Sequence, residues 1–168
     1  MERLIDRLPD DVERLAHTLL DQACDRGLSL ATAESCTGGL IAAILTDVEG
    51  TSHAFERGFV VYTIEAKAGL LGIPRSLIDT HGVVSREIAL AMVQGALNHS
   101  AADIALAVTG FAGPAGAGKE AGLVHFGAVR RGRQPFHREA HFGDRGRGAV
   151  RIESVRVGLA MMIEALGN

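Results

Sequence analysis

The sequence is short of aromatic residues and of excess charge, and these two shortages exclude one class of function. It has no tryptophan and one tyrosine, and aromatic residues make up 4% of its 168 positions. Proteins that bind single-stranded nucleic acid stack the bases on aromatic side chains. Phosphate backbones are bound by broad basic surfaces, which a net charge of −3 does not indicate. We therefore expect no nucleic-acid partner.

Cysteines and long apolar runs are equally scarce. Cys24 and Cys36 are too few for a disulfide framework or a cysteine-rich metal knuckle, so we expect reduced, partly buried thiols. No apolar stretch approaches the roughly 18 residues that cross a bilayer. Residues 1–7 are charged and lack the apolar core of a secretory signal. We therefore expect a cytoplasmic protein with no membrane partner.

The residues that are present have the composition of one ordinary globular domain. They are 47% hydrophobic and 22% charged, and 168 residues are enough to bury a core without disulfides. The chain contains no repeat, linker or low-complexity tract. We expect a single domain over residues 1–168.

Hydrophobic periodicity divides this domain into alternating helices and strands. Pro9 and Ser85 precede apolar residues at helical spacing and are suited to begin helices. The predicted helices cover about 10–26, 38–46, 65–71, 85–97 and 148–166, with a further helical turn after Pro74. The predicted strands cover about 28–33, 58–62, 104–108, 123–129 and 136–142, the last two as a hairpin. This order predicts a three-layer α/β/α sandwich with a mostly parallel, mixed sheet of about five strands.

Three polar or glycine-rich loops follow predicted strands: Glu34–Gly39, Tyr62–Lys67 and Thr109–Lys119. In open α/β sheets ligands bind at the carboxyl ends of the strands. Glycines let backbone N–H groups approach an oxyanion or a phosphate. None of the loops is a known nucleotide fingerprint, because the first lacks G-x-G-x-x-G and the third precedes a strand where a P-loop precedes a helix.

The first loop places Ser35 where a strand gives way to a helix, as in hydrolases with a nucleophile elbow. A simpler interpretation is that Ser35 or Thr37 caps the following helix. Cys36 is either a second candidate nucleophile or a small buried thiol. A serine nucleophile needs a base, and Lys67 is the candidate if its amine is desolvated, as in Ser-Lys variants of the catalytic triad. The alternative for a lone helix lysine is a solvent-facing side chain.

The seven histidines are scattered and form no recognisable triad spacing. His125, His137 and His141 fall on the faces of the two hairpin strands. An H-x-x-x-H pair on a strand does not bring both imidazoles to one helix face, so we expect no metal ligands.

Three segments together resemble the CinA C-terminal domain family. They are Thr32–Gly39 (TAESCTGG), Phe55–Lys67, which contains G-F-x-x-Y and E-A-K, and Thr109–Pro114 (TGFAGP). The resemblance spans about residues 10–166. Stand-alone members of this family include nicotinamide-nucleotide amidohydrolases. Longer members carry an N-terminal domain similar to molybdopterin-binding proteins, which we do not expect in a chain of 168 residues.

The resemblance implies hydrolysis of the carboxamide of nicotinamide mononucleotide, a small-molecule pyridine mononucleotide, to nicotinate mononucleotide and ammonia, without a metal or other cofactor. It gives Ser35 the role of nucleophile and Lys67 that of general base. Tyr62 matches a tyrosine near that lysine, and Ser52 a serine that assists proton transfer. The helix N-terminus after Ser35 would hold the oxyanion. Substrate contacts are expected from the first and third loops: Thr37, Gly38, Gly39, Thr109 and Gly110.

The segment Gly143–Arg151 resembles the basic start of the family's last helix. Arg147 and Arg151 fit that frame, and Arg145 is an additional candidate. There the helix dipole and the guanidinium groups would both favour the 5′-phosphate of the substrate. A solvated basic face is the alternative. The family also implies a homo-oligomer, a dimer or higher.

The sequence departs from the family pattern at two places. Ile64 stands where members commonly have asparagine, and Lys119–Gly122 replaces a Lys-Pro-x-Gly segment. These departures leave two other functions open. One is a nucleotide-binding module without turnover, and the other is a competence-associated partner protein, as the family's name suggests.

Overall fold

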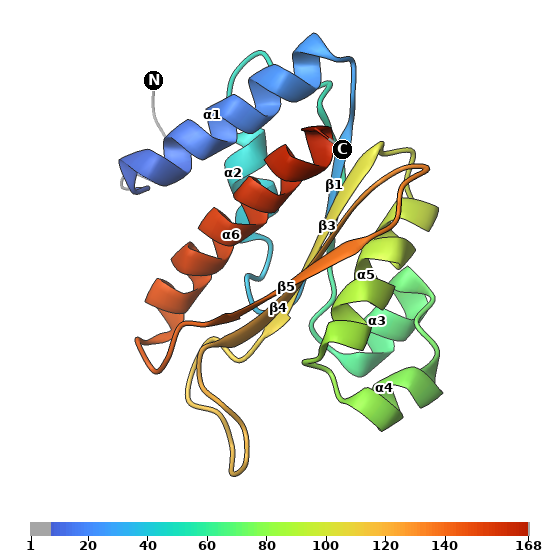
Figure 1. Cartoon of the computed structure of the whole chain (residues 1–168), viewed down its shortest axis with the longest axis vertical. Coiled ribbons are helices and arrows are strands. Elements are labelled where there is room, and N and C mark those ends of the chain that lie inside the picture. Colours follow the sequence, from blue (N-terminus) through green and yellow to red (C-terminus); the bar gives the residue numbers. More distant parts are fainter. Residues whose placement is uncertain (1–7, 168) are drawn as a thin grey trace.

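The computed structural model describes residues 8–167 of the chain, so the charged segment 1–7 considered above lies outside the described residues. Helices and strands alternate along the described part, as predicted (Figure 1). The helices are α1 (Asp10–Asp25), α2 (Leu40–Thr46), α3 (Ile64–Leu71), α4 (Arg75–His81), α5 (Arg86–Asn98) and α6 (Arg147–Gly167). The strands are β1 (Leu30–Glu34), β2 (Phe55–Val60), β3 (Ile104–Gly110), β4 (Leu123–Arg130) and β5 (Phe136–His141).

The strands form one sheet in the order β2-β1-β3-β4-β5. Strand β1 pairs in parallel with β2 and with β3, whereas β4 is antiparallel to β3 and to β5. Within this sheet β4 alone runs against the other four strands. The expected five-stranded, mostly parallel mixed sheet with a terminal hairpin is therefore confirmed.

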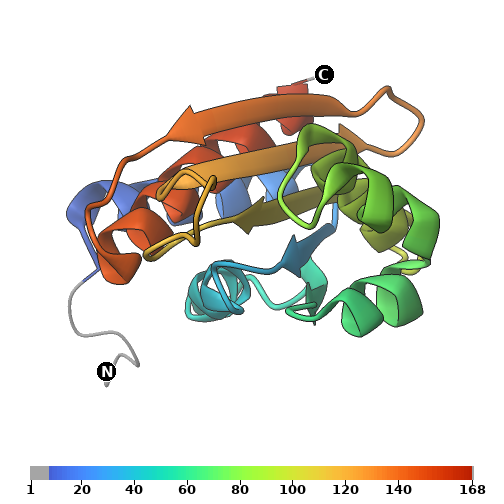
Figure 2. The same cartoon turned by 90° about the horizontal axis from the view of Figure 1, so that it is seen from below.

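Helices cover both faces of the sheet and make the predicted three layers. Helices α1, α2 and α6 lie on one face, and α3, α4 and α5 lie on the other (Figure 1). The view from below shows β3, β4 and β5 between α6 and α5 (Figure 2). No helix in residues 8–167 combines the length and the apolar character that crossing a bilayer requires.

The apolar run of β3 shows how the sequence supplies two buried faces. Its side chains alternate, so that Leu106 and Val108 pack on the α6 side while Ala105 and Ala107 pack on the α5 side. Burying one leucine or valine fully contributes about 1.5–3 kcal/mol. Because alanine side chains are small, α5 can lie close to the sheet on this side. At Gly127 of β4 an added Cβ would lie 2.7 Å from the carbonyl oxygen of Ala89, so any larger residue would push α5 away.

Local signals set most element ends, and Ser85 caps α5 as predicted by accepting a hydrogen bond from the Ile88 N–H at 3.2 Å. Two elements differ from the prediction by more than two residues. Strand β2 begins at Phe55, three residues before the expected 58–62, because it is an edge strand with exposed polar residues that hide its alternation. The turn expected after Pro74 is the complete helix α4.

Candidate active site

The three polar and glycine-rich loops meet in one cleft of about 250 Å³. It lies where β1 and β3 end and α3 begins, which is the edge of an open α/β sheet where ligands bind. The lining residues are Ser35, Cys36, Tyr62, Lys67, Val83, Val84, Thr109, Gly110, Phe111, Ala112, Gly113, Pro114 and Arg147.

Ser35 and Lys67 touch at the bottom of this cleft. The Lys67 Nζ lies 3.0 Å from the Ser35 Oγ, 2.7 Å from the Val61 carbonyl oxygen and 3.4 Å from the Tyr62 carbonyl oxygen. These three oxygens suit either form of the amine. A charged amine donates to all of them, whereas a neutral amine donates to the two carbonyls and accepts the Ser35 proton.

Helix α3 carries Lys67 into the interior. The Thr63 side chain accepts a hydrogen bond from the Ala66 N–H at 3.1 Å and so starts the helix one turn before Lys67. The inward side of this helix is formed by Lys67 and Leu71, which are four residues apart. A lysine thus occupies a position where a leucine or isoleucine is usual, and its side chain is only 1% exposed. The solvent-facing alternative for Lys67 is wrong.

Burial controls the protonation of both candidate groups beside Ser35. Removal from water lowers the pKa of Lys67, and no carboxylate within residues 8–167 forms an ion pair with it. Burial also raises the pKa of the Cys36 thiol to about 12, with the Glu34 charge as a smaller contribution in the same direction. At neutral pH Cys36 is therefore a protonated thiol, which is a poor nucleophile. The buried-thiol interpretation of Cys36 is the one the structure favours.

Glu34 organises the turn that carries Ser35. Its fully buried carboxylate accepts hydrogen bonds from the N–H groups of Gly39, Ile41 and Ala42 at 3.2, 3.1 and 2.8 Å. The N-terminus of α2 is thereby occupied by a side chain of the protein itself. Two expectations are corrected: neither Ser35 nor Thr37 caps α2, and these N–H groups are not free for an oxyanion.

Arg151 of α6 holds the same turn from the other side. Its Nε donates to the Thr37 carbonyl oxygen at 3.1 Å, and its Nη2 donates to the same oxygen. Gly38 and Gly39 have φ angles of +62° and +91°, which let the turn reverse at this point. The Thr37 hydroxyl is buried and has no hydrogen-bond partner among the described residues. Arg151 therefore positions the nucleophile turn and does not line the cleft.

Of the three arginines proposed to bind phosphate, Arg147 lies in the cleft. It is exposed at the first residue of α6, forms no ion pair within residues 8–167, and its Nη2 lies 3.2 Å from the position of an added Cβ at Gly113. Arg145 instead pairs with Glu153 at 3.5 Å on the surface. The segment is thus no uniform basic face, because its three guanidinium groups have three different surroundings.

The third loop forms the opposite wall. Thr109 is 1% exposed, and its hydroxyl donates to the Val83 carbonyl oxygen at 2.7 Å. Gly110 lies so close to β4 that an added Cβ would be 2.8 Å from the Leu123 carbonyl oxygen. A strand follows this loop, as predicted, and the Lys119 Nζ lies 5.4 Å from the centre of the Phe111 ring.

Two predicted catalytic residues are placed differently from the Ser35–Lys67 pair. Tyr62 lines the cleft, but its side chain is 66% exposed, and its carbonyl oxygen is the group that faces Lys67. Ser52 is exposed before β2, at the amino end of the strands and so at the opposite end from Ser35, where it lines a separate hollow of about 290 Å³. The structure does not bring Ser52 to Ser35 within one copy of the chain. Ile64 begins α3 and is not among the lining residues.

Comparisons with known proteins identify the family of the chain and solved structures with the same fold. The family model described as the CinA C-terminal domain matches residues 12–166. The crystal structure of the competence/damage inducible protein CihA from Agrobacterium tumefaciens superposes with a TM-score of 0.93 at 45% identity, covering 98% of this chain and 100% of that one.

Two sequence relatives differ in length. The nicotinamide-nucleotide amidohydrolase PncC of Escherichia coli K12 is 43% identical over 137 residues, which cover 80% of this chain and 82% of that protein. A CinA-like protein of Chlorobium luteolum is 54% identical over 106 residues, which cover 63% of this chain and 25% of that protein. The chain thus spans only about a quarter of the longer relative.

Proposed function

This chain belongs to the CinA C-terminal domain family, and from that premise we propose that it hydrolyses the carboxamide of nicotinamide mononucleotide, with Ser35 as nucleophile and Lys67 as general base. The observation that carries the proposal is the 3.0 Å contact between the Ser35 Oγ and a buried Lys67 Nζ without a carboxylate partner in residues 8–167. The name of the E. coli relative supplies the substrate class.

The first half of the reaction forms an acyl-enzyme. Neutral Lys67 takes the hydroxyl proton of Ser35 while the Oγ attacks the carboxamide carbon. The tetrahedral intermediate then collapses: the C–N bond breaks, and the Lys67 ammonium returns the proton to the leaving nitrogen, which departs as ammonia. Burial assists both steps, because it favours the neutral amine and excludes competing water.

The oxyanion needs donors other than those of α2, because Glu34 occupies them. The N–H groups of Cys36 and Thr37 follow the nucleophile directly and donate to no other residue in the described part of the chain. In hydrolases with a nucleophile elbow the residue after the nucleophile supplies such a donor. One donor of this kind contributes about 3 kcal/mol to the transition state.

The second half of the reaction restores the enzyme. Water attacks the acyl carbon and gives its proton to Lys67, the bond from the acyl carbon to the Ser35 Oγ breaks, and Lys67 returns the proton to Ser35. Nicotinate mononucleotide is released. We assign the phosphate of the substrate to Arg147, because this guanidinium lies at the rim of the cleft and is unpaired within residues 8–167.

The alternative of a binding module without turnover rested on Ile64 and on the altered loop at Lys119. Ile64 lies outside the lining of the cleft, and the Ser35–Lys67 contact is intact. Neither departure removes a group that the proposed chemistry uses. The alternative of a competence-associated partner has no support beyond the names of relatives.

The proposal is tested by incubating the purified chain with nicotinamide mononucleotide and measuring ammonia together with nicotinate mononucleotide. We expect equal amounts of the two products from the parent chain. Ser35→Ala and Cys36→Ala are a matched pair from one turn. Ser35→Ala should lose at least about 10³-fold in kcat, whereas Cys36→Ala should stay within a few-fold. Full activity of Ser35→Ala, or substrate binding by the parent chain without products, would contradict the proposal.

A homo-oligomer and a cytoplasmic location stay predictions. Three large apolar side chains, Val60, Tyr62 and Leu70, are 50%, 66% and 51% exposed on β2, its following loop and α3. They offer a place for a second copy. Light scattering on the purified chain tests this, and a monomer at all concentrations would contradict it.

A further inference from the structure

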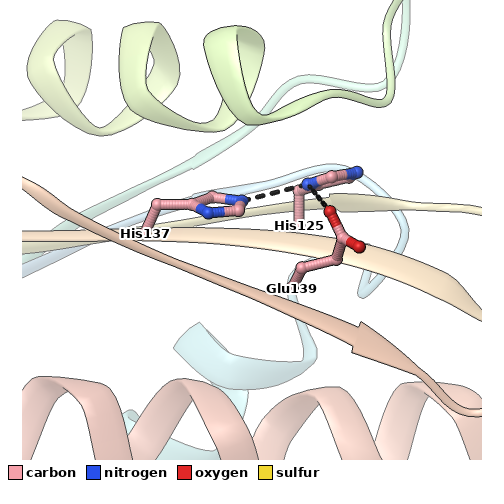
Figure 3. Close-up of side chains that lie close together, drawn as sticks. All are labelled: His125, His137 and Glu139. Carbon is pink, nitrogen blue, oxygen red and sulfur yellow. Dashed lines mark hydrogen bonds and ion pairs between the residues drawn. The ribbon is translucent and has the colours of Figure 1, made fainter.

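A second group of polar side chains lies on the β4–β5 hairpin, outside the cleft (Figure 3). The register of the hairpin places His125 of β4 directly opposite Glu139 of β5, and His137 precedes Glu139 by two residues. Residues two apart on a strand, and residues opposite each other across a ladder, share one face. All three side chains therefore lie on the α5 side of the sheet.

Three potential metal ligands converge here. The His125 Nδ1 lies 3.0 Å from the His137 Nε2 and 3.6 Å from a carboxylate oxygen of Glu139 (Figure 3). One ligand atom from each residue lies within 4.8 Å of the other two. Two ligands of a tetrahedral zinc ion with bonds of about 2.0–2.1 Å are about 3.3 Å apart. Small rotamer changes would therefore close the three atoms around one ion.

We propose that His125, His137 and Glu139 bind one divalent transition-metal ion, of the class of zinc. Two imidazole nitrogens and one carboxylate oxygen are the ligands that Zn²⁺ and its neighbours in the first transition series prefer, whereas Mg²⁺ and Ca²⁺ prefer oxygen alone. Three protein ligands leave a further position for water.

Neighbouring side chains orient the ligands of the cluster. The His125 and His137 rings stack with their centres 5.2 Å apart, and His125 is 6% exposed. His141 contacts one oxygen of Glu139 at 2.7 Å and Glu120 at 2.8 Å, which leaves the other oxygen of Glu139 for the ion. Metal-binding side chains are commonly oriented by outer hydrogen bonds of this kind.

Charged groups of α5 face the same cluster. Glu87 favours positive charge at both His125 and His137, whereas Arg86 opposes it at His137. Glu139 is 44% exposed in its side chain, so an ion can enter from solvent beside it, while His125 forms the buried end. Glu139 and Glu87 thus favour a cation at the cluster, whereas Arg86 opposes it at His137 and His141 opposes it at His125.

The sequence-based expectation of no metal ligands considered only the spacing of His137 and His141 along one strand. His137 and His141 on β5 do not form a ligand pair, but the antiparallel register adds His125 from β4. The inference is independent of the proposed hydrolysis, because neither Ser35 nor Lys67 contacts the cluster. The two sites are nevertheless close in space. Thr109 in the wall of the cleft and His125 are opposite residues in the antiparallel pairing of β3 with β4.

Titration of the complete, tag-free chain with Co²⁺ alone, followed by visible absorption, and with Zn²⁺ alone, followed by calorimetry, tests the site. We expect one ion per chain and a Co²⁺ spectrum typical of histidine ligation. His137→Asn and Glu139→Gln should each weaken binding at least about tenfold, because each removes one ligand atom. Both positions are at least partly exposed, so these variants should fold, which circular dichroism checks.

His53→Ala is the matched control, because His53 is exposed in the loop before β2 at the opposite edge of the sheet. It should bind both ions as the parent chain does. Zn²⁺ should also raise the unfolding temperature of the parent chain and of His53→Ala, but not that of His137→Asn. Absence of saturable binding at one equivalent, or equal affinity in the parent chain and His137→Asn, would overturn the proposal.

Discussion

The Ser35–Lys67 pair and the His125–His137–Glu139 cluster lie on the same face of the sheet and differ in charge and in exposure. Ser35 follows Ala33, a core residue on the α5 side, by two positions, and the cluster lies on that side as well. Lys67 is 1% exposed and has no carboxylate partner in residues 8–167. Glu139 is 44% exposed in its side chain and contacts two histidines.

This difference separates two uses of a buried basic nitrogen. Where burial acts without a neighbouring carboxylate, as at Lys67, the amine is driven toward its neutral form and can accept a proton from Ser35. Where a carboxylate lies beside two imidazoles, as Glu139 lies beside His125 and His137, the three side chains together offer ligand atoms to a cation. Changes that affect one region and spare the other therefore test this division.

Substitution of Lys67 should have the largest effect. Lys67→Met keeps the length of the side chain but removes the base, and Lys67→Arg keeps the charge but holds its proton permanently. Both should lower kcat/KM for nicotinamide mononucleotide by at least about 10³-fold, or about 4 kcal/mol. Stopped assays of nicotinate mononucleotide measure this loss.

The comparison is sharpened by titrating Lys67→Met with Co²⁺, because its metal affinity should equal that of the parent chain. Substantial activity of Lys67→Arg would show that Lys67 acts through its positive charge. That result would contradict the role of Lys67 as base.

Glu34→Gln should cause the next largest effect, on stability. The variant replaces a buried carboxylate that accepts three backbone N–H bonds at the start of α2. Hydrogen bonds to charged groups contribute about 1.5–3 kcal/mol each. Glutamine keeps one acceptor oxygen, so we expect about one of the three bonds to be lost and the free energy of unfolding to fall by about 2–3 kcal/mol in urea titrations. Glu164→Gln, which breaks an exposed pair with Arg138, should change it by less than about 1 kcal/mol. Equal losses in both variants would mean that Glu34 does not organise the nucleophile turn.

Arg147→Ala should cause a smaller, substrate-specific effect. Loss of a phosphate contact should raise KM for nicotinamide mononucleotide about tenfold, or about 1.4 kcal/mol, with kcat little changed. The riboside, which lacks the phosphate, should be hydrolysed equally by the parent chain and the variant. Arg145→Ala is the matched control, because Arg145 is paired with Glu153 on the surface. A larger effect of Arg145→Ala than of Arg147→Ala would place the phosphate elsewhere.

Ser52→Ala should have the smallest effect. Ser52 lies at the amino end of the strands and Ser35 at their carboxyl end, so we expect kcat and KM within about twofold of the parent values. Steady-state kinetics on both proteins measure them. A large loss of kcat would restore the proton-transfer role that the family resemblance gave to Ser52, and it would require a second copy of the chain to supply this residue.

The fold was predictable because its signals are local and strong. The run at β3, the Ser85 cap and the alternation of β4 and β5 each identify an element from its own residues. The start of β2 could not be predicted, because an edge strand with polar residues lacks the alternation of buried residues on which such predictions depend. Its register is set by pairing with β1, which no single segment of sequence reveals.

The candidate site was predictable where residue type and motif coincide, as at Ser35 and Lys67. Glu34 was missed as a helix cap because its partners, the N–H groups of α2, are backbone atoms whose direction depends on the fold. The hairpin cluster was missed because cross-strand register brings His125 beside residues 12 and 14 positions later. A buried carboxylate before two glycines, and histidines on both strands of a hairpin, are the signals that could have found them.

The protonation of Lys67 can be measured directly. Selective ¹⁵N labelling of lysine allows the Lys67 Nζ to be followed by NMR as a function of pH, with Lys119 as the exposed internal reference. We predict that Lys67 titrates below the usual lysine pKa of about 10.4, and that kcat/KM rises with pH through the same midpoint, because the neutral amine is the base. A Lys67 that titrates at or above the usual lysine pKa, or activity that does not follow the Lys67 midpoint, would contradict the proposed mechanism.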